Sequence, residues 1–247
     1  MKVESDGCLI PKPRSRDPNN IVKQRAESVR HFPLFSEIPS EDCERIVALA
    51  HERSYRRGKT IFFDGDPVRQ IVFLTSGAAR LSQTGSQGQE VILRLVGPGE
   101  LLCVECFPKC THCSTASAVE ESAALVWEAS QFQAVRDRFQ ILGRNITCVL
   151  VQTLNDLEVR FREVSTAKTA VRLSHQLVRL LDQIGKHSTG HVEIAVSQRD
   201  LAQLTGTTIF TVNRLLNEWE AQGIVKLKRE ALQVLDVQAL MEVSETE

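Results

Sequence analysis

Short apolar runs alternate with turn residues over roughly residues 50 to 130 of this chain. The runs include TIFFDGD, QIVFLTSG and EVILRLVGPGE, and glycine-containing turns separate them. Short strands at such regular spacing are typical of an antiparallel barrel or sandwich. A short helix is expected just before them, because SEDCERIVALAHER begins with polar residues and then carries apolar positions at helical spacing.

The pattern changes after Ser130 to a long helical period with no proline. One stripe of this helix steps by four and three: Leu142, Ile146, Val149, Thr153, Leu157 and Arg160. This spacing is typical of a coiled-coil seam, and so long a helix is unusual within one compact domain. We therefore predict that the stripe meets a second copy of the chain in a homodimer. The alternative is a helix that lies along its own barrel.

Near the C-terminus, SQRDLAQLTGTTIFTVNRLLNEWEAQGIV is typical of a helix-turn-helix. Two amphipathic helices flank a tight turn that Gly206 permits. The following segment, IVKLKREALQVLD, is expected to form a two-stranded wing. The alternative is an ordinary helical hairpin with solvated charges, but an exposed Ile209–Phe210 pair beside several hydroxyl groups is unusual without a partner.

The exposed face of the second of these helices is expected to bind double-stranded DNA. N-terminal side chains of a reading helix reach base edges in the major groove, while hydroxyl and cationic groups bind phosphates. Arg214 is suited to a bidentate contact with guanine, and Phe210 to a contact with a thymine methyl group. The predicted DNA-binding residues are Ser197, Gln198, Thr207, Thr208, Phe210, Thr211, Asn213, Arg214, Lys226 and Lys228.

Four of the seven cysteines form a C-x2-C-x3-C-x2-C cluster within LLCVECFPKCTHCS. Thiolates two or three residues apart can converge on one centre, and they are the ligands of iron–sulfur clusters and of structural zinc. We predict a [4Fe-4S] cluster with these ligands: Cys103, Cys106, Cys110 and Cys113. Structural zinc, a dithiol–disulfide switch and inert thiols are the alternatives at the same positions.

Three residues outside that set are further candidates for metal ligands. Cys148 on the long helix is either an additional metal ligand or a packed thiol, Cys8 lies on the N-terminal arm, and His112 sits between two cluster cysteines. Cys43 is expected to be a buried, inert thiol. Metal enzymes commonly use sets of histidine and carboxylate ligands, and the sequence shows no such set, so we do not expect an enzyme.

The composition limits the number of domains, the kind of nucleic-acid surface and the cellular compartment that we expect. The chain has 247 residues, of which 42% are hydrophobic, and this favours two domains. The net charge of −1 allows only a local basic face for nucleic acid. No apolar segment has the length of a membrane span or of a signal-peptide core, so a cytoplasmic protein without membrane contact is expected. Thiols are reduced there, which favours metal or redox chemistry over structural disulfides.

The segments FPLFSEIPSEDCERI, YRRGKTIFFDGD, IVFLTSGAARL, GPGELL and TVNRLL, together with the long helix, resemble the CRP/FNR superfamily of bacterial transcription regulators. The resemblance implies an α+β fold and a homodimer that binds palindromic DNA, with RNA polymerase as a partner if the protein is an activator. It divides the chain into an N-terminal arm (1–25), a cupin-like sensor β-roll (26–130), a dimerisation helix (131–165) and a winged helix-turn-helix domain (166–247).

The chain departs from two branches of that superfamily. In the cyclic-nucleotide branch a glutamate binds the ribose and an Arg-Ser pair binds the phosphate, whereas here Cys103 and Val104 take the first place and Ser114 and Thr115 lie near the second. A buried cyclic phosphate would lack a charge partner, so cyclic AMP is not expected as the effector. The oxygen-sensing branch uses several cysteines of its arm, whereas this arm has only Cys8, so the ligand set differs.

We therefore expect a DNA-binding regulator that senses redox state, oxygen or nitric oxide through a cysteine-ligated cluster. The alternative is a regulator with structural zinc or a dithiol switch at these cysteines and a small-molecule effector other than cyclic AMP. The reading helix carries Ile209 and Phe210 where the cyclic-AMP branch places an arginine and a glutamate on bases. A different operator is expected for that reason.

Overall fold

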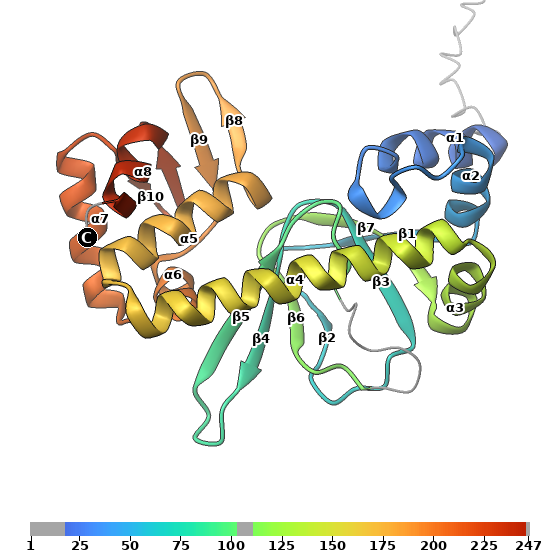
Figure 1. Cartoon of the computed structure of the whole chain (residues 1–247), viewed down its shortest axis with the longest axis horizontal. Coiled ribbons are helices and arrows are strands. Elements are labelled where there is room, and N and C mark those ends of the chain that lie inside the picture. The colour runs from blue at the N-terminus through green and yellow to red at the C-terminus, as the bar shows by residue number, and fades with distance from the viewer. Residues whose placement is uncertain (1–17, 103–110, 246–247) are drawn as a thin grey trace, which may run out of the picture.

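The computed structural model describes residues 18–102 and 111–245 (Figure 1). Cys8 and three of the four cysteines of the cluster, Cys103, Cys106 and Cys110, lie outside the described residues. The described chain begins with α1 (Pro18–Val29), η1 (Pro33–Phe35) and α2 (Ser40–Ala48). α2 is the predicted short helix, and α1 begins within the stretch we assigned to the arm.

The described part of the β-roll contains seven strands: β1 (His51–Tyr55), β2 (Thr60–Phe62), β3 (Gln70–Ser76), β4 (Ala79–Thr84), β5 (Glu90–Val96), β6 (Thr115–Ala118) and β7 (Ser122–Glu128). They pair into two antiparallel sheets, β1-β7-β3 and β2-β6-β4-β5. Successive side chains of a strand point to opposite faces, so β3 buries Val72 and Leu74 between the sheets and Ile71 and Phe73 under the helices.

The helix that we predicted as one continuous element is two helices, α3 (Ala129–Arg138) and α4 (Gln140–Thr166). Phe139 separates them with non-helical dihedrals, φ −107° and ψ 88°. The side chain of Phe139 packs on the buried cluster beneath the helices, and this turns the chain at that point. α4 then runs beside the roll towards the C-terminal domain (Figure 1).

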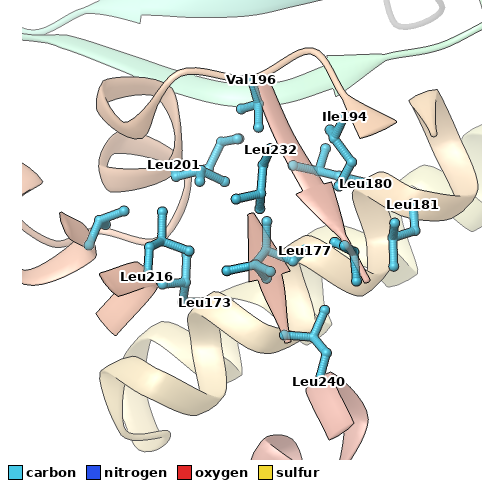
Figure 2. Close-up of a cluster of buried hydrophobic side chains, with 14 of the residues drawn as sticks. Leu173, Leu177, Leu180, Leu181, Ile194, Val196, Leu201, Leu216, Leu232 and Leu240 are labelled. Carbon is cyan, nitrogen blue, oxygen red and sulfur yellow. The ribbon is translucent and has the colours of Figure 1, made fainter. Parts of the chain in front are cut away.

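The C-terminal domain contains α5 (Thr169–Ile184), β8 (Lys186–Ser188), β9 (His191–Ile194), α6 (Gln198–Leu204), α7 (Ile209–Ala221), β10 (Val225–Lys228), β11 (Ala231–Val234) and α8 (Val237–Glu245). Its sheet has the order β10-β11-β9-β8. Leu177 of α5, Leu216 of α7 and Leu232 of β11 meet in its core (Figure 2).

Roll and C-terminal domain share part of this core. Ile92 and Leu95 of β5, together with Ala78, belong to the same buried cluster as the leucines of α5. Burial of apolar area is the main favourable term in association, so the two domains hold each other in this arrangement. Among residues 18–102 and 111–245, no helix is long and apolar enough to cross a membrane.

Candidate nucleic-acid interface and cysteine cluster

α6 and α7 form the helix-turn-helix, and side-chain caps fix both of their starts. Ser197 caps α6 in a capping box: its Oγ accepts from the Asp200 backbone N at 3.1 Å, and Asp200 Oδ2 accepts from the Ser197 backbone N at 3.2 Å. Thr208 caps α7 through its Oγ1, which accepts from the Thr211 backbone N at 3.2 Å. Both hydroxyls that we expected at DNA therefore also hold the helix starts.

Gly206 takes φ +61° in the turn between the two helices. Glycine reaches this left-handed region without a Cβ clash. Thr207 follows it, and its backbone N donates to the Ala202 carbonyl at 2.9 Å. The turn that we expected from the sequence is closed by these backbone contacts.

α7 buries one face and presents the other to solvent. Val212, Leu215, Leu216 and Trp219 are buried. Phe210 is 83% exposed, and Asn213 and Arg214 are also on the surface. Asn213 Nδ2 donates to Gln198 Oε1 at 3.0 Å, so the polar faces of α6 and α7 form one surface. Arg214 pairs with Glu218 at 2.7 Å, an exposed contact that contributes little and that a nucleic acid can replace.

The predicted wing is the antiparallel pair β10 and β11. Lys226 and Lys228 of β10 are exposed, whereas Val225 between the wing and the core is buried. Glu230 in the turn of the wing has φ +59° and forms an ion pair with Arg57 of the roll at 2.8 Å. The wing thus carries the expected cations and also touches the sensor domain.

A second ion pair joins the domains at the helix-turn-helix. Arg80 of β4 contacts Asp200 of α6 at 3.3 Å. A cavity of about 640 Å³ lies between the domains, and Gln198, Ile209 and Lys228 line it on the C-terminal side. Sequence reasoning missed these contacts, because the partners are more than a hundred residues apart and no local pattern marks them.

The described part of the cysteine loop is its two ends. Leu102 donates its backbone N to the Val72 carbonyl at 2.9 Å, and His112 donates its backbone N to the Asp66 carbonyl at 2.8 Å. Cys113 is exposed, and its carbonyl accepts from Gln83 Nε2 at 2.6 Å. The segment that contains the other three cysteines therefore starts and ends at fixed points of the roll.

His112 is turned into the roll. Its ring stacks on Phe62 with centroids 3.6 Å apart and is almost fully buried. Burial lowers the pKa of His112 and so favours the neutral ring, and Asp66 opposes part of this shift. Among the described residues no group of three His, Cys, Asp or Glu side chains is placed to hold a metal, and Cys103, Cys106 and Cys110 lie outside them.

Cys43 and Cys148 occupy opposite environments. Cys43 is buried in α2, and burial raises the pKa of its thiol to about 11. Cys148 is exposed on α4. We expect iodoacetamide at about pH 8 to alkylate Cys148 readily and to leave Cys43 unmodified, since this pKa lowers the thiolate fraction about 100-fold relative to an ordinary cysteine. Peptide mass spectrometry would test this, with unfolded protein as the control in which both react; prompt labelling of native Cys43 would contradict the burial.

α4 has two apolar stripes, and the one that we predicted as the dimer seam faces the chain's own roll. Leu142 and Ile146 are buried there, and Asn145 beside them donates to the Leu34 and Ser36 carbonyls. Arg160 at the other end of this stripe donates to the Leu93 carbonyl at 2.7 Å. The seam assignment was therefore wrong for Leu142, Ile146 and Arg160, whereas Leu157 of the same predicted seam is 42% exposed.

A second stripe steps by the same four and three, and apart from Leu150, which packs partly on the core of the roll, it is exposed in the described chain. Its members are Leu150, Leu154, Leu157, Phe161 and Val164. Leu154 is 56% exposed and Phe161 is 77% exposed. A contiguous apolar surface of this kind marks an interaction site.

Comparisons with known proteins agree with this architecture. A cyclic nucleotide-binding domain model matches residues 52–139, and a Crp-like helix-turn-helix domain model matches residues 171–243. The fold and the exposed reading helix define a DNA-binding regulator with a β-roll sensor domain. The chain belongs to the CRP/FNR family of transcription regulators, whose members are not enzymes.

Individual relatives cover most of the chain. The chain is 28% identical over 213 residues to the cyclic AMP receptor protein of Thermus thermophilus, covering 86% of this chain and 96% of the relative. The solved structure of FixK2 from Bradyrhizobium japonicum matches with a TM-score of 0.69 at 20% identity and covers 78% of this chain and 96% of that one. The solved structure of a CRP-family transcriptional regulator from Thermus thermophilus matches with a TM-score of 0.68 at 19% identity. The match covers 78% of this chain and 97% of that one. These two structures support the fold.

Proposed function

We propose that the protein is a homodimer in which the stripe of Leu150, Leu154, Leu157, Phe161 and Val164 pairs with its copy. Exposed apolar residues at steps of four and three are the seam of a two-stranded coiled coil. The observation that carries the proposal is the exposure of Phe161 and Leu154 on a helix whose other face is already packed on the roll. A dimer places two α7 helices on two half-sites of a palindrome.

In this proposal α7 reads the major groove and the wing binds phosphates. Arg214 contacts a guanine, and Phe210 packs against a thymine methyl group. Asn213 and Thr211 add polar contacts, while Lys226 and Lys228 neutralise the backbone. The support comes from the exposure of these groups along one polar surface formed by α6, α7 and β10.

The signal is proposed to enter at the cysteine loop as a change in a [4Fe-4S] cluster. Its ligands would be Cys103, Cys106, Cys110 and Cys113, and the bound cluster would supply sensitivity to oxygen, redox state or nitric oxide. The fixed ends of the loop, at Leu102 and His112, support a response that moves the roll rather than the loop alone. Zinc at the same thiolates is the competing outcome, and analysis of metal and sulfide content distinguishes the two.

Contacts between the roll and the DNA-binding domain are proposed to transmit that signal. The Arg57–Glu230 and Arg80–Asp200 pairs hold the wing and α6 against the roll. Gln198 and Lys228 face the cavity between the domains in this arrangement, so DNA binding requires the domains to shift. Exposed ion pairs contribute little each, and a modest differential free energy is then sufficient to change the populations.

Replacing Arg214 by alanine is expected to lower operator affinity about 10- to 100-fold, because a bidentate contact to guanine is lost. Non-specific DNA binding should change little by comparison. Electrophoretic mobility shifts with an operator selected from random DNA would measure this. Glu218→Ala is the matched control, since it removes the ion-pair partner of Arg214 but keeps the guanidinium. Equal losses in both variants would show that the ion pair, and not base recognition, accounts for the effect.

A further inference from the structure

A second cavity, of about 930 Å³, lies on the side of α4 away from its exposed apolar stripe. It is bounded by the α1–η1 connection, the end of β5 with its following turn, α4 and α5. α4 lines it with Asn145, Val149, Gln152 and Asp156, which recur every three or four residues and so share one face.

Five arginines line this cavity, and three of them, from three different elements, lie near one another. Arg94 comes from β5, Arg160 from α4 and Arg179 from α5. Arg94 pairs with Glu100 at 2.9 Å, and Arg179 forms a two-pronged pair with Glu163 at 2.9 and 2.8 Å. Arg160 donates to the Leu93 carbonyl and forms no ion pair within the described residues.

The environment of Arg160 is unfavourable for an unneutralised cation. Burial, with Arg179 and Arg94 nearby, lowers the pKa of Arg160 from its ordinary value, and Asp156 and Glu163 offset only part of this shift. Arg179 also has an unsatisfied donor, because its Nε is buried and has no hydrogen-bond partner among the described residues. A partly buried cation such as Arg160 is costly unless an anion pairs with it.

We propose that this cavity binds a small anion with at least two acidic groups, carboxylate or phosphate, held by Arg160 together with Arg94 and Arg179. Guanidinium groups bind both acids through paired N–H donors, and neighbouring guanidiniums suit a ligand with more than one negative charge. The cavity is large enough for a metabolite rather than a single inorganic ion.

The position of the site makes the anion an effector. Arg94 belongs to the sensor roll, Arg160 to α4 and Arg179 to the first helix of the C-terminal domain. A ligand that bridges all three favours the arrangement of the domains in which they converge. Among the described residues, the lining of this site contains none of the ligands proposed for the cluster, and the anion proposal is tested independently of the iron–sulfur proposal.

Thermal unfolding of the full-length protein tests the proposal, with citrate and inorganic pyrophosphate as probes and sodium chloride at equal ionic strength as the reference. We expect citrate or pyrophosphate at several times its Kd to raise the Tm of the wild type by about 2–4 °C. Arg160→Met should abolish this rise. It should unfold no earlier than the wild type without the anion, because it removes a buried cation. Arg162→Met is the matched control, since Arg162 is exposed on the same helix outside the cavity and should leave the rise intact.

Either of two results would overturn the proposal: no rise above the chloride reference with both probes, or an equal rise in wild type and Arg160→Met. If Arg160→Met does not fold, Gln152→Glu replaces it as the test, because it adds a negative charge to an exposed position of the cavity lining. That variant should halve the rise or reduce it further. An unchanged rise would count against the site.

Discussion

Replacing Phe161 by glutamate in α4 is expected to convert the protein from dimer to monomer and to lower operator affinity by at least about 100-fold. Phe161 is 77% exposed in the single chain and lies in the uncovered stripe with Leu157 and Val164. A carboxylate there would face its own copy across a seam that excludes water. Loss of the dimer removes the second half-site contact, and with it the gain that linked binding provides.

Sedimentation velocity would measure the change in mass, and mobility shifts would measure the change in DNA affinity. Arg162→Glu is the matched control, because it places the same carboxylate on α4 at an exposed position outside the stripe. It should remain dimeric. A dimeric Phe161→Glu variant with wild-type operator affinity would show that the subunits meet elsewhere.

Replacing Cys110 by serine is expected to lower the iron and sulfide content of protein purified without oxygen at least about 10-fold, and to remove the redox response of operator binding. A hydroxyl is a poor substitute for a thiolate in an iron–sulfur cluster, and the loop has no spare thiol to take the place of Cys110. Cys148→Ser is the control, because Cys148 lies on α4, apart from the loop, and is exposed. Wild-type metal content and wild-type redox response in Cys110→Ser would refute the assigned ligand set.

The elements of the roll and of the helix-turn-helix were predictable because their patterns are local. The turn at Gly206 and the buried stripe of α7 follow from spacing alone, and the structure places them as expected. The seam of α4 was not predictable in this way. Two stripes of the same helix carry apolar residues at steps of four and three, and periodicity cannot tell which of them packs on the roll. Contacts of Asn145 with the Leu34 and Ser36 carbonyls decide it, and these are about 110 positions apart in the chain.

The break at Phe139 was missed for a related reason. No proline or glycine marks the break. The backbone at Phe139 departs from helical dihedrals, and the side chain packs against a buried cluster whose members come from distant parts of the sequence. The ion pairs between the domains and the three arginines around Arg160 were likewise out of reach, since each joins elements distant in sequence. The spacing of the cysteines, in contrast, is a purely local signal, and the structure adds the fixed ends of their loop.

Iron and acid-labile sulfide analysis of protein purified without oxygen, with a visible spectrum of the same sample, distinguishes an iron–sulfur centre from a zinc site at the cysteine cluster. We predict a brown protein with about four iron and four sulfide per chain, and loss of both on exposure to air together with a change in operator binding. A colourless protein with zinc in place of iron would contradict this prediction and make the cysteines a structural site.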